Sequence, residues 1–206
     1  MRYIINILLL LVARGRALYT SNHFEEAFKS FAIVPDVLST VPRAELSVNY
    51  FTDTVYLGNI ISPYDAIMPP HVTYEASPNG LYTLAIVDPD MPSKRSNYDK
   101  EYINMLILNI PGTNITDGND IVNYIAPNPY PGSGYHRYVF LVYRQEYHID
   151  VKTKYFNKLA TTLTGFSISD FAKKYDLGDP IAGNFFRAHL IICESGSYQP
   201  RKKCSK

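Results

Sequence analysis

Two short segments of this chain carry residues that could hold an anion. Residues 88–92 read Asp-Pro-Asp-Met-Pro at the end of an apolar stretch, and residues 132–138 read Gly-Ser-Gly-Tyr-His-Arg-Tyr at the start of another. The prolines keep the first segment out of helix and sheet geometry, which fixes the directions of its carboxylates. The glycines of the second let backbone amides approach a ligand closely. Together the segments predict a small anion site at one end of a β-rich fold.

The second segment supplies the hydrogen-bond donors. His136 can donate to an anionic oxygen, and a carboxylate such as Asp88 nearby would increase its protonated fraction. Tyr138 follows two residues later, so strand alternation places its phenol on the same side as His136. Ordinary structural roles stay open as alternatives, because aspartates beside proline often cap turns and histidines before strands often only hydrogen-bond.

Chemistry beyond binding has little support in the sequence. Ser133 stands in Gly132-Ser133-Gly134, which lacks the Gly-x-Ser-x-Gly spacing of a hydrolase nucleophile. No spacing of Cys and His is typical of a metal site. We therefore expect no enzyme activity, no cofactor and no metal, with water activated by Asp88 and His136 as the alternative.

Hydrophobic patterning predicts the elements that position these groups. Residues 23–31 have helical spacing, which Pro35 is expected to end. Short alternating runs then predict strands at 46–50, 55–57 and 72–74, and longer apolar runs predict strands at 81–87, 102–110, 138–147 and 184–193. Helices are expected at 152–163 and after a cap at Ser167 or Ser169. This pattern predicts a mainly β protein with a few peripheral helices.

The first 17 residues are typical of a secretory signal. Arg2 precedes an apolar run at 4–13, and small residues stand at 15 and 17. The run is too short to span a bilayer. We expect a signal peptide at 1–17 and one domain at 18–206, with an uncleaved cytosolic chain as the alternative.

The charge of the exported chain bears on its partners. Removing Arg2, Arg14 and Arg16 changes the formal net charge from +1 to −2. Nucleic-acid binding needs a concentrated basic surface, so a near-neutral chain argues against it.

Export would also allow two covalent modifications. Cys193 and Cys204 are the two cysteines of the chain and could pair in an oxidising compartment, although Cys193 could instead be a buried thiol on an apolar strand. Asn114 begins an Asn-Ile-Thr sequon in a loop, which predicts glycosylation.

Six segments make the chain similar to a known family, the phosphatidylethanolamine-binding proteins, which include Raf kinase inhibitor proteins and flowering-time regulators of plants. The resemblance covers nearly all of the mature chain. The segments, in order, are 33–37, 69–72, 81–93, 108–112, 134–143 and 171–186.

The resemblance implies a β-sandwich of two antiparallel sheets with C-terminal helices and a shallow pocket for phosphate-type anions. It implies that the Met91–Pro92 bond is cis, that Asp90 and Arg137 brace the pocket from behind, and that the pocket is lined by Asp88, Pro92, His136 and Tyr138. Asn104 stands where the family usually has a second histidine, and a neutral amide there should lower anion affinity. Tyr198 is nearest to the tyrosine that often closes the pocket.

Two functions are consistent with these features. In the first, the protein binds a phospholipid headgroup or a small phosphorylated ligand without chemistry. In the second, it is a secreted interaction protein that inhibits a serine protease or regulates a kinase pathway. The second follows from the resemblance, because no residue pattern here indicates it.

Overall fold

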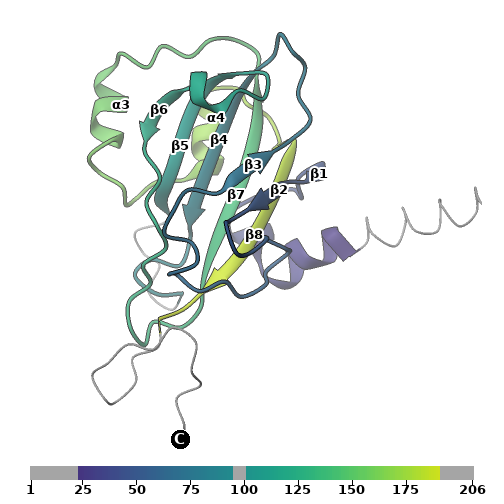
Figure 1. Cartoon of the computed structure of the whole chain (residues 1–206). Coiled ribbons are helices and arrows are strands. Elements are labelled where there is room, and N and C mark those ends of the chain that lie inside the picture. The colour runs from purple at the N-terminus through teal and green to yellow at the C-terminus, as the bar shows by residue number, and fades with distance from the viewer. Residues whose placement is uncertain (1–22, 95–100, 191–206) are drawn as a thin grey trace, which may run out of the picture.

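Two layers of β-sheet build the protein, with helices on the outer face of the larger one (Figure 1). The computed structural model describes residues 23–94 and 101–190. The six-stranded sheet has the order β1-β8-β7-β4-β5-β6, and β2 pairs with β3 in a second, two-stranded sheet. The strands are β1 Ala44–Glu45, β2 Ser47–Asn49, β3 His71–Thr73, β4 Leu81–Asp88, β5 Tyr102–Pro111, β6 Asn119–Val122, β7 His136–Gln145 and β8 Ala182–Ala188.

The central strands are largely apolar because both of their faces are buried. On β4, Ala85 and Val87 face a cluster shared with the helices, while Leu84 and Ile86 face a cluster shared with β2 and β3. Alternation thus sends successive side chains into two different cores. This double burial explains why the sequence shows long apolar runs at these strands instead of a polar–apolar alternation.

Strand register brings the two anion-site segments together. β4 and β7 are antiparallel neighbours, with Val87 opposite Val139. The C-terminal end of β4, which carries Asp88, therefore lies beside the N-terminal end of β7, which carries His136 and Tyr138. Residues far apart in the chain meet at one end of the sheet.

The α-helices pack on one face of this sheet, whereas Ile115 of the 3-10 turn packs on the other. Residues 23–30 are helical and are followed by α2 Ile33–Asp36, while α3 spans Lys154–Leu159, α4 spans Ile168–Lys174, and a 3-10 turn spans Ile115–Asp117. Ser167 caps α4, since its side chain accepts a hydrogen bond from the Asp170 N–H. Of the two cap residues that the sequence offered, Ser167 is thus the one used.

The predicted class, mainly β with stacked sheets and peripheral helices, is confirmed. The antiparallel prediction needs one correction, because β1 runs parallel to β8 and the larger sheet is mixed. The strand predicted at 55–57 is wrong: Asn184 accepts from the Leu57 N–H and donates to the Val55 carbonyl, so a side chain satisfies these backbone groups. Pro35 does not end the first helix. It lies inside α2, after a turn in which Ala32 has a φ of 55°.

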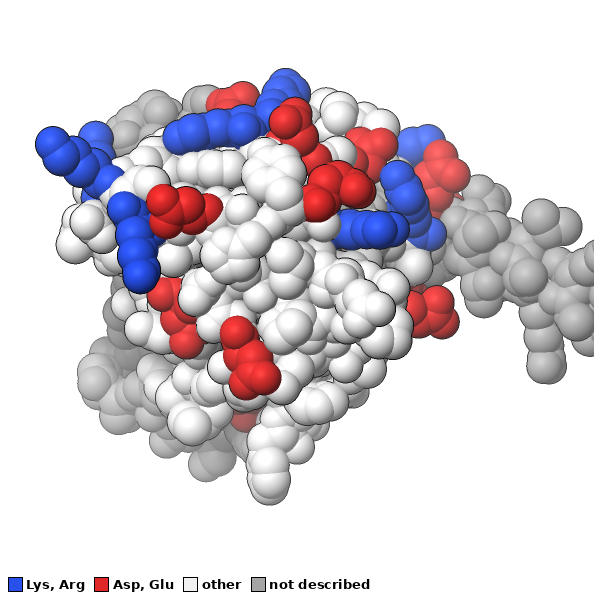
Figure 2. Space-filling model, turned by 90° about the horizontal axis from the view of Figure 1, so that it is seen from above, with Lys and Arg blue, Asp and Glu red and all other residues white. Residues whose placement is uncertain are grey.

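The surface seen from above carries mixed charge. Figure 2 shows basic and acidic side chains interspersed over part of this face, with a broad uncharged area beside them. Neither sign gathers into a single large patch on this face. Within 23–94 and 101–190, no helix combines the length and the apolar character needed to cross a bilayer.

Candidate functional site

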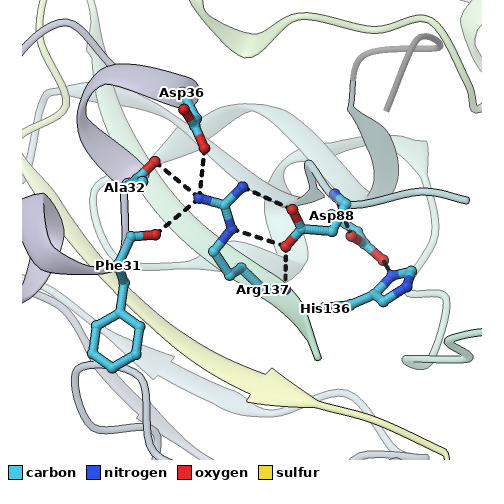
Figure 3. A network of polar contacts seen from close by, with 7 residues as sticks. Phe31, Ala32, Asp36, Asp88, His136 and Arg137 are labelled. Atoms are coloured by element: carbon cyan, nitrogen blue, oxygen red, sulfur yellow. Dashed lines mark hydrogen bonds and ion pairs between the residues drawn. The ribbon is translucent and has the colours of Figure 1, made fainter. Parts of the chain in front are cut away.

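The carboxylate and the imidazole predicted for the site are in direct contact. His136 Nδ1 lies 2.8 Å from Asp88 Oδ2, a contact drawn as a dashed line in Figure 3. The other oxygen of Asp88 accepts the Asp90 N–H at 2.8 Å, which forms a turn just after β4. Asp88 is 2% exposed and His136 is fully buried. The pair is therefore oriented by its surroundings, as a preorganised site requires.

Arg137 fixes the loop behind this pair. Its Nε and Nη2 donate to the two oxygens of Asp90 at 2.8 and 2.7 Å, and its backbone N–H donates to Asp90 Oδ2 at 2.9 Å. Its Nη1 donates to the carbonyls of Phe31 and Ala32 and to Asp36, each at 2.9 Å (Figure 3). Arg137 thus joins the loop after β4 to the end of the first helix. Asp90 and Arg137, to which the resemblance gave a bracing role, thus bond to each other.

Tyr138 completes the cluster from β7. Its side chain is 1% exposed and stacks on Phe186 with ring centroids 5.1 Å apart. Burial raises the pKa of the Tyr138 phenol strongly, and the nearby Asp88 carboxylate adds to this increase. The phenol therefore stays protonated and can donate a hydrogen bond. The backbone of Asn128, in the proline-rich segment before β7, also lies against this hydroxyl.

Burial and polar contacts have opposite effects on the pKa of Asp88 and on that of Arg137. Burial raises the pKa of the Asp88 carboxyl, while the hydrogen bonds from His136 and the Asp90 N–H act against it. For Arg137, burial alone would lower the pKa, but the bonds and charges of Asp90 and Asp36 outweigh it and raise the pKa. Arg137 is accordingly a permanent cation that compensates Asp90 inside the protein.

Ser133 is a member of the site that the sequence analysis missed. Its Oγ lies 2.9 Å from His136 Nε2 and 2.6 Å from the carbonyl oxygen of Tyr130. Both ring nitrogens of His136 therefore have partners, and the turn at 130–133 closes over the imidazole. The spacing of Ser133 and His136, three residues apart across a glycine, is the sequence signal that could have indicated this contact.

Asn104 is placed differently from what we expected. Its Nδ2 donates to the Ile125 carbonyl at 3.0 Å, and its backbone oxygen accepts the Ile125 N–H at 2.7 Å. Its Oδ1 is buried without a hydrogen-bond partner. The side chain therefore holds the segment after β6 and does not contact Asp88 or His136 through any hydrogen bond described for it.

The remaining predicted residues fall into two groups. Pro92 is half-buried after a cis Met91–Pro92 bond, as the resemblance implied, and Asn114 is exposed at the start of the 3-10 turn. Tyr198, Cys193, Cys204 and the signal segment 1–17 lie outside the described residues. Within the described ranges, no group of three or more His, Cys, Asp or Glu side chains is placed to hold a metal ion.

Comparison with known families and proteins gives consistent results. A family model described as phosphatidylethanolamine-binding protein matches residues 45–186. A protein of Toxocara canis named "26 kDa secreted antigen" is 38% identical over 165 residues, which are 78% of this chain and 62% of that protein. The chain thus spans less than two thirds of that relative's length.

Two further matches cover a larger share of the matched protein's own length. The Drosophila melanogaster protein named "Putative odorant-binding protein A5" is 28% identical over 179 residues, 86% of this chain and 85% of that protein. A carboxypeptidase Y inhibitor, solved in complex with its cognate proteinase, is similar in structure with a TM-score of 0.69 and 26% identity, covering 82% of this chain and 96% of the inhibitor.

Proposed function

Since the chain belongs to the phosphatidylethanolamine-binding protein family, we propose that it binds small phosphate-type anions, phospholipid headgroups included, without transforming them. The site is the cluster of Asp88, His136 and Tyr138. The observation that supports this proposal is the meeting of a carboxylate, an imidazole and a phenol at the adjoining ends of β4 and β7.

His136 Nε2 is the donor that an anion would use. Asp88 accepts from Nδ1 and orients the ring, so Nε2 can donate to an anion in the imidazolium form, in which both ring nitrogens carry a proton. Nε2 faces Ser133, so a ligand oxygen has to replace the Ser133 hydroxyl. The turn at 130–133 must therefore open when an anion binds.

Affinity should be modest for two reasons. Displacing Ser133 removes one hydrogen bond before the ligand forms its own, and Asn104 already uses an amide hydrogen on Ile125. One or two charge-assisted hydrogen bonds from a single site correspond to dissociation constants of roughly micromolar to millimolar.

An NMR titration with inorganic phosphate and with phosphoethanolamine tests this function. We expect saturable shifts of the His136 ring and of backbone amides in the 130–138 segment, and their loss in His136→Ala. His71→Ala is the matched control, because His71 is an exposed histidine on β3 whose ring contacts Thr73. Saturation that persists unchanged in His136→Ala, or no saturation in the wild type, would contradict the proposal.

Peptidase inhibition is a second candidate function. It is favoured by the similarity to the inhibitor that was solved with carboxypeptidase Y, which covers nearly all of that inhibitor. Inhibition of a serine carboxypeptidase by the purified chain, measured with a chromogenic peptide, would support it. Full peptidase activity at a large excess of the chain across a panel of serine peptidases would rule it out.

We also propose that the chain is exported. Homologues named as a secreted antigen and as an odorant-binding protein favour an extracellular location. The signal segment at 1–17 and the exposed sequon at Asn114 are consistent with that route. A cytosolic partner such as a kinase is correspondingly disfavoured.

A further inference from the structure

Ser133, His136 and Asp88 form a continuous hydrogen-bonded chain. Ser133 Oγ lies 2.9 Å from His136 Nε2, and His136 Nδ1 lies 2.8 Å from Asp88 Oδ2. This is the arrangement of a nucleophile, a base and an orienting carboxylate, which is recognised by geometry and not by position in the sequence. We propose that Ser133 is an activated nucleophile that carboxylic esters can acylate.

The proton of the Ser133 hydroxyl has two acceptors. Tyr130 O lies 2.6 Å from Oγ and His136 Nε2 lies 2.9 Å from it, but a hydroxyl carries one hydrogen. When the hydroxyl donates to Tyr130 O, Nε2 must itself carry a proton to bond Oγ. When the imidazole is neutral with its proton on Nδ1, Oγ donates to Nε2, and this second state is the nucleophilic one.

The carboxylate determines which tautomer is present. Asp88 accepts from Nδ1, so a neutral His136 keeps its proton on Nδ1 and leaves the Nε2 lone pair facing Ser133. Asp88 itself is held by the Asp90 N–H and by burial. The base therefore cannot rotate freely, which preserves its alignment with Oγ.

The nucleophile is reachable from solvent although its base is not. Ser133 is half-buried, whereas His136 is fully buried. The flanking Gly132 and Gly134 have φ values of 78° and 91°, and a Cβ built at either one would meet nothing within 4 Å. The backbone on both sides of Ser133 therefore borders open space.

The acylation step balances without an additional reactant. Oγ forms a bond to the ester carbonyl carbon while its proton passes to His136 Nε2. The bond between that carbon and the alcohol oxygen then breaks, and the departing alcohol takes the proton from Nε2. The product is an acyl group on Ser133, with Asp88 stabilising the transient imidazolium through Nδ1.

An alkyl fluorophosphonate probe tests this inference. Oγ attack forms a P–O bond, the P–F bond breaks, fluoride leaves, and the proton goes to His136 and then to solvent. We expect peptide mapping to find the phosphonyl group on Ser133, and labelling to be absent in Ser133→Ala. His136→Gln and Asp88→Asn should label more slowly by roughly 100-fold or more, the usual contribution of a positioned base.

Ser30→Ala is the matched control. Ser30 Oγ also donates to a carbonyl three residues back, that of Ala27 at 3.2 Å, but no histidine is bonded to it. The control should label at the wild-type rate. Wild-type protein that stays unlabelled, a label on another residue, or an equal rate in His136→Gln with a wild-type circular dichroism spectrum would each overturn the inference.

This inference does not rest on anion binding. Phosphate titration reports on displacement of Ser133 from Nε2, whereas the probe reports on covalent reaction at Oγ. A protein that binds phosphate but is not labelled contradicts only the nucleophile, and a labelled protein that does not bind phosphate contradicts only the proposed function.

Discussion

At the scale of single residues, the site is defined by competition for the Nε2 atom of His136. Ser133 of the protein's own turn and a ligand oxygen cannot both hydrogen-bond with that nitrogen in the same direction. The intramolecular partner is always present, so it reduces the affinity of every ligand that needs this donor. Removing the hydroxyl should therefore change binding in a predictable direction.

Ser133→Ala should strengthen binding of inorganic phosphate. The variant leaves Nε2 without its internal partner, and one net hydrogen bond corresponds to about 0.5–1.5 kcal/mol, or about two- to tenfold in affinity. NMR titration measures this against wild type and against Ser30→Ala. A larger or unchanged dissociation constant would show that the hydroxyl does not compete with the ligand.

A second prediction concerns His189, which follows β8. The centroids of its ring and of the Tyr135 ring lie 4.1 Å apart, and burial lowers the pKa of His189 below its usual value of 6.5. Because the unfolded chain binds the proton more tightly, the contribution of this group to stability decreases as the pH falls below 6.5. An NMR titration should give a low pKa that moves back toward 6.5 in Tyr135→Ala. No movement would assign the shift to other neighbours.

At the scale of elements, Arg137 connects three parts of the fold. It joins β7 to the loop after β4 through Asp90 and to the end of the first helix through Asp36 and two carbonyls. The two carboxylates differ in environment, since the side chain of Asp90 is fully buried and that of Asp36 is 38% exposed. Replacing each aspartate by asparagine should therefore lower the free energy of unfolding by different amounts.

Asp90→Asn should lower the free energy of unfolding by about 3–5 kcal/mol, because it leaves the buried guanidinium without its main counter-ion. Asp36→Asn should cost below about 1 kcal/mol, as is typical of ion pairs open to solvent. Urea denaturation of the two variants measures the difference. Equal costs would mean that the helix contact, and not the loop contact, anchors Arg137.

The elements also show what patterning predicts well. The strands at 81–87, 102–110 and 138–147 were predicted because double burial requires long apolar runs, which are visible in sequence. Residues 55–57 were mispredicted because their backbone partner is the side chain of Asn184, more than 120 residues away by position. Local propensity cannot indicate such a distant side-chain partner.

At the scale of the whole molecule, the site depends on register between distant strands. Asp88 and His136 were predicted as partners since each stands at the end of an apolar run. The Ser133 contact could not be deduced in the same way, because it requires the turn at 130–133 to fold back over His136. The bond of Asn104 to Ile125 could not be deduced for a similar reason, since it depends on how the segment after β6 returns to β5.

Export is a prediction for the whole chain. The secreted protein should begin at Leu18, carry a glycan on Asn114 and contain a Cys193–Cys204 disulfide, because an oxidising compartment permits both modifications. Intact mass before and after glycosidase and reductant measures all three. Asn114→Gln should remove the glycan, and a full-length chain with free thiols and no glycan would contradict the prediction.

The anchoring of Arg137 on the carbonyls of Phe31 and Ala32 has a consequence for divergence of the chain. A carbonyl oxygen belongs to the backbone, so replacing either side chain leaves the acceptor in place. Substitutions at positions 31 and 32 therefore keep both acceptors, provided that residue 32 still tolerates its left-handed backbone and that a new side chain at position 31 still packs on Phe185. Homologues that differ at both positions can retain the same hydrogen bonds from Arg137 to these carbonyls.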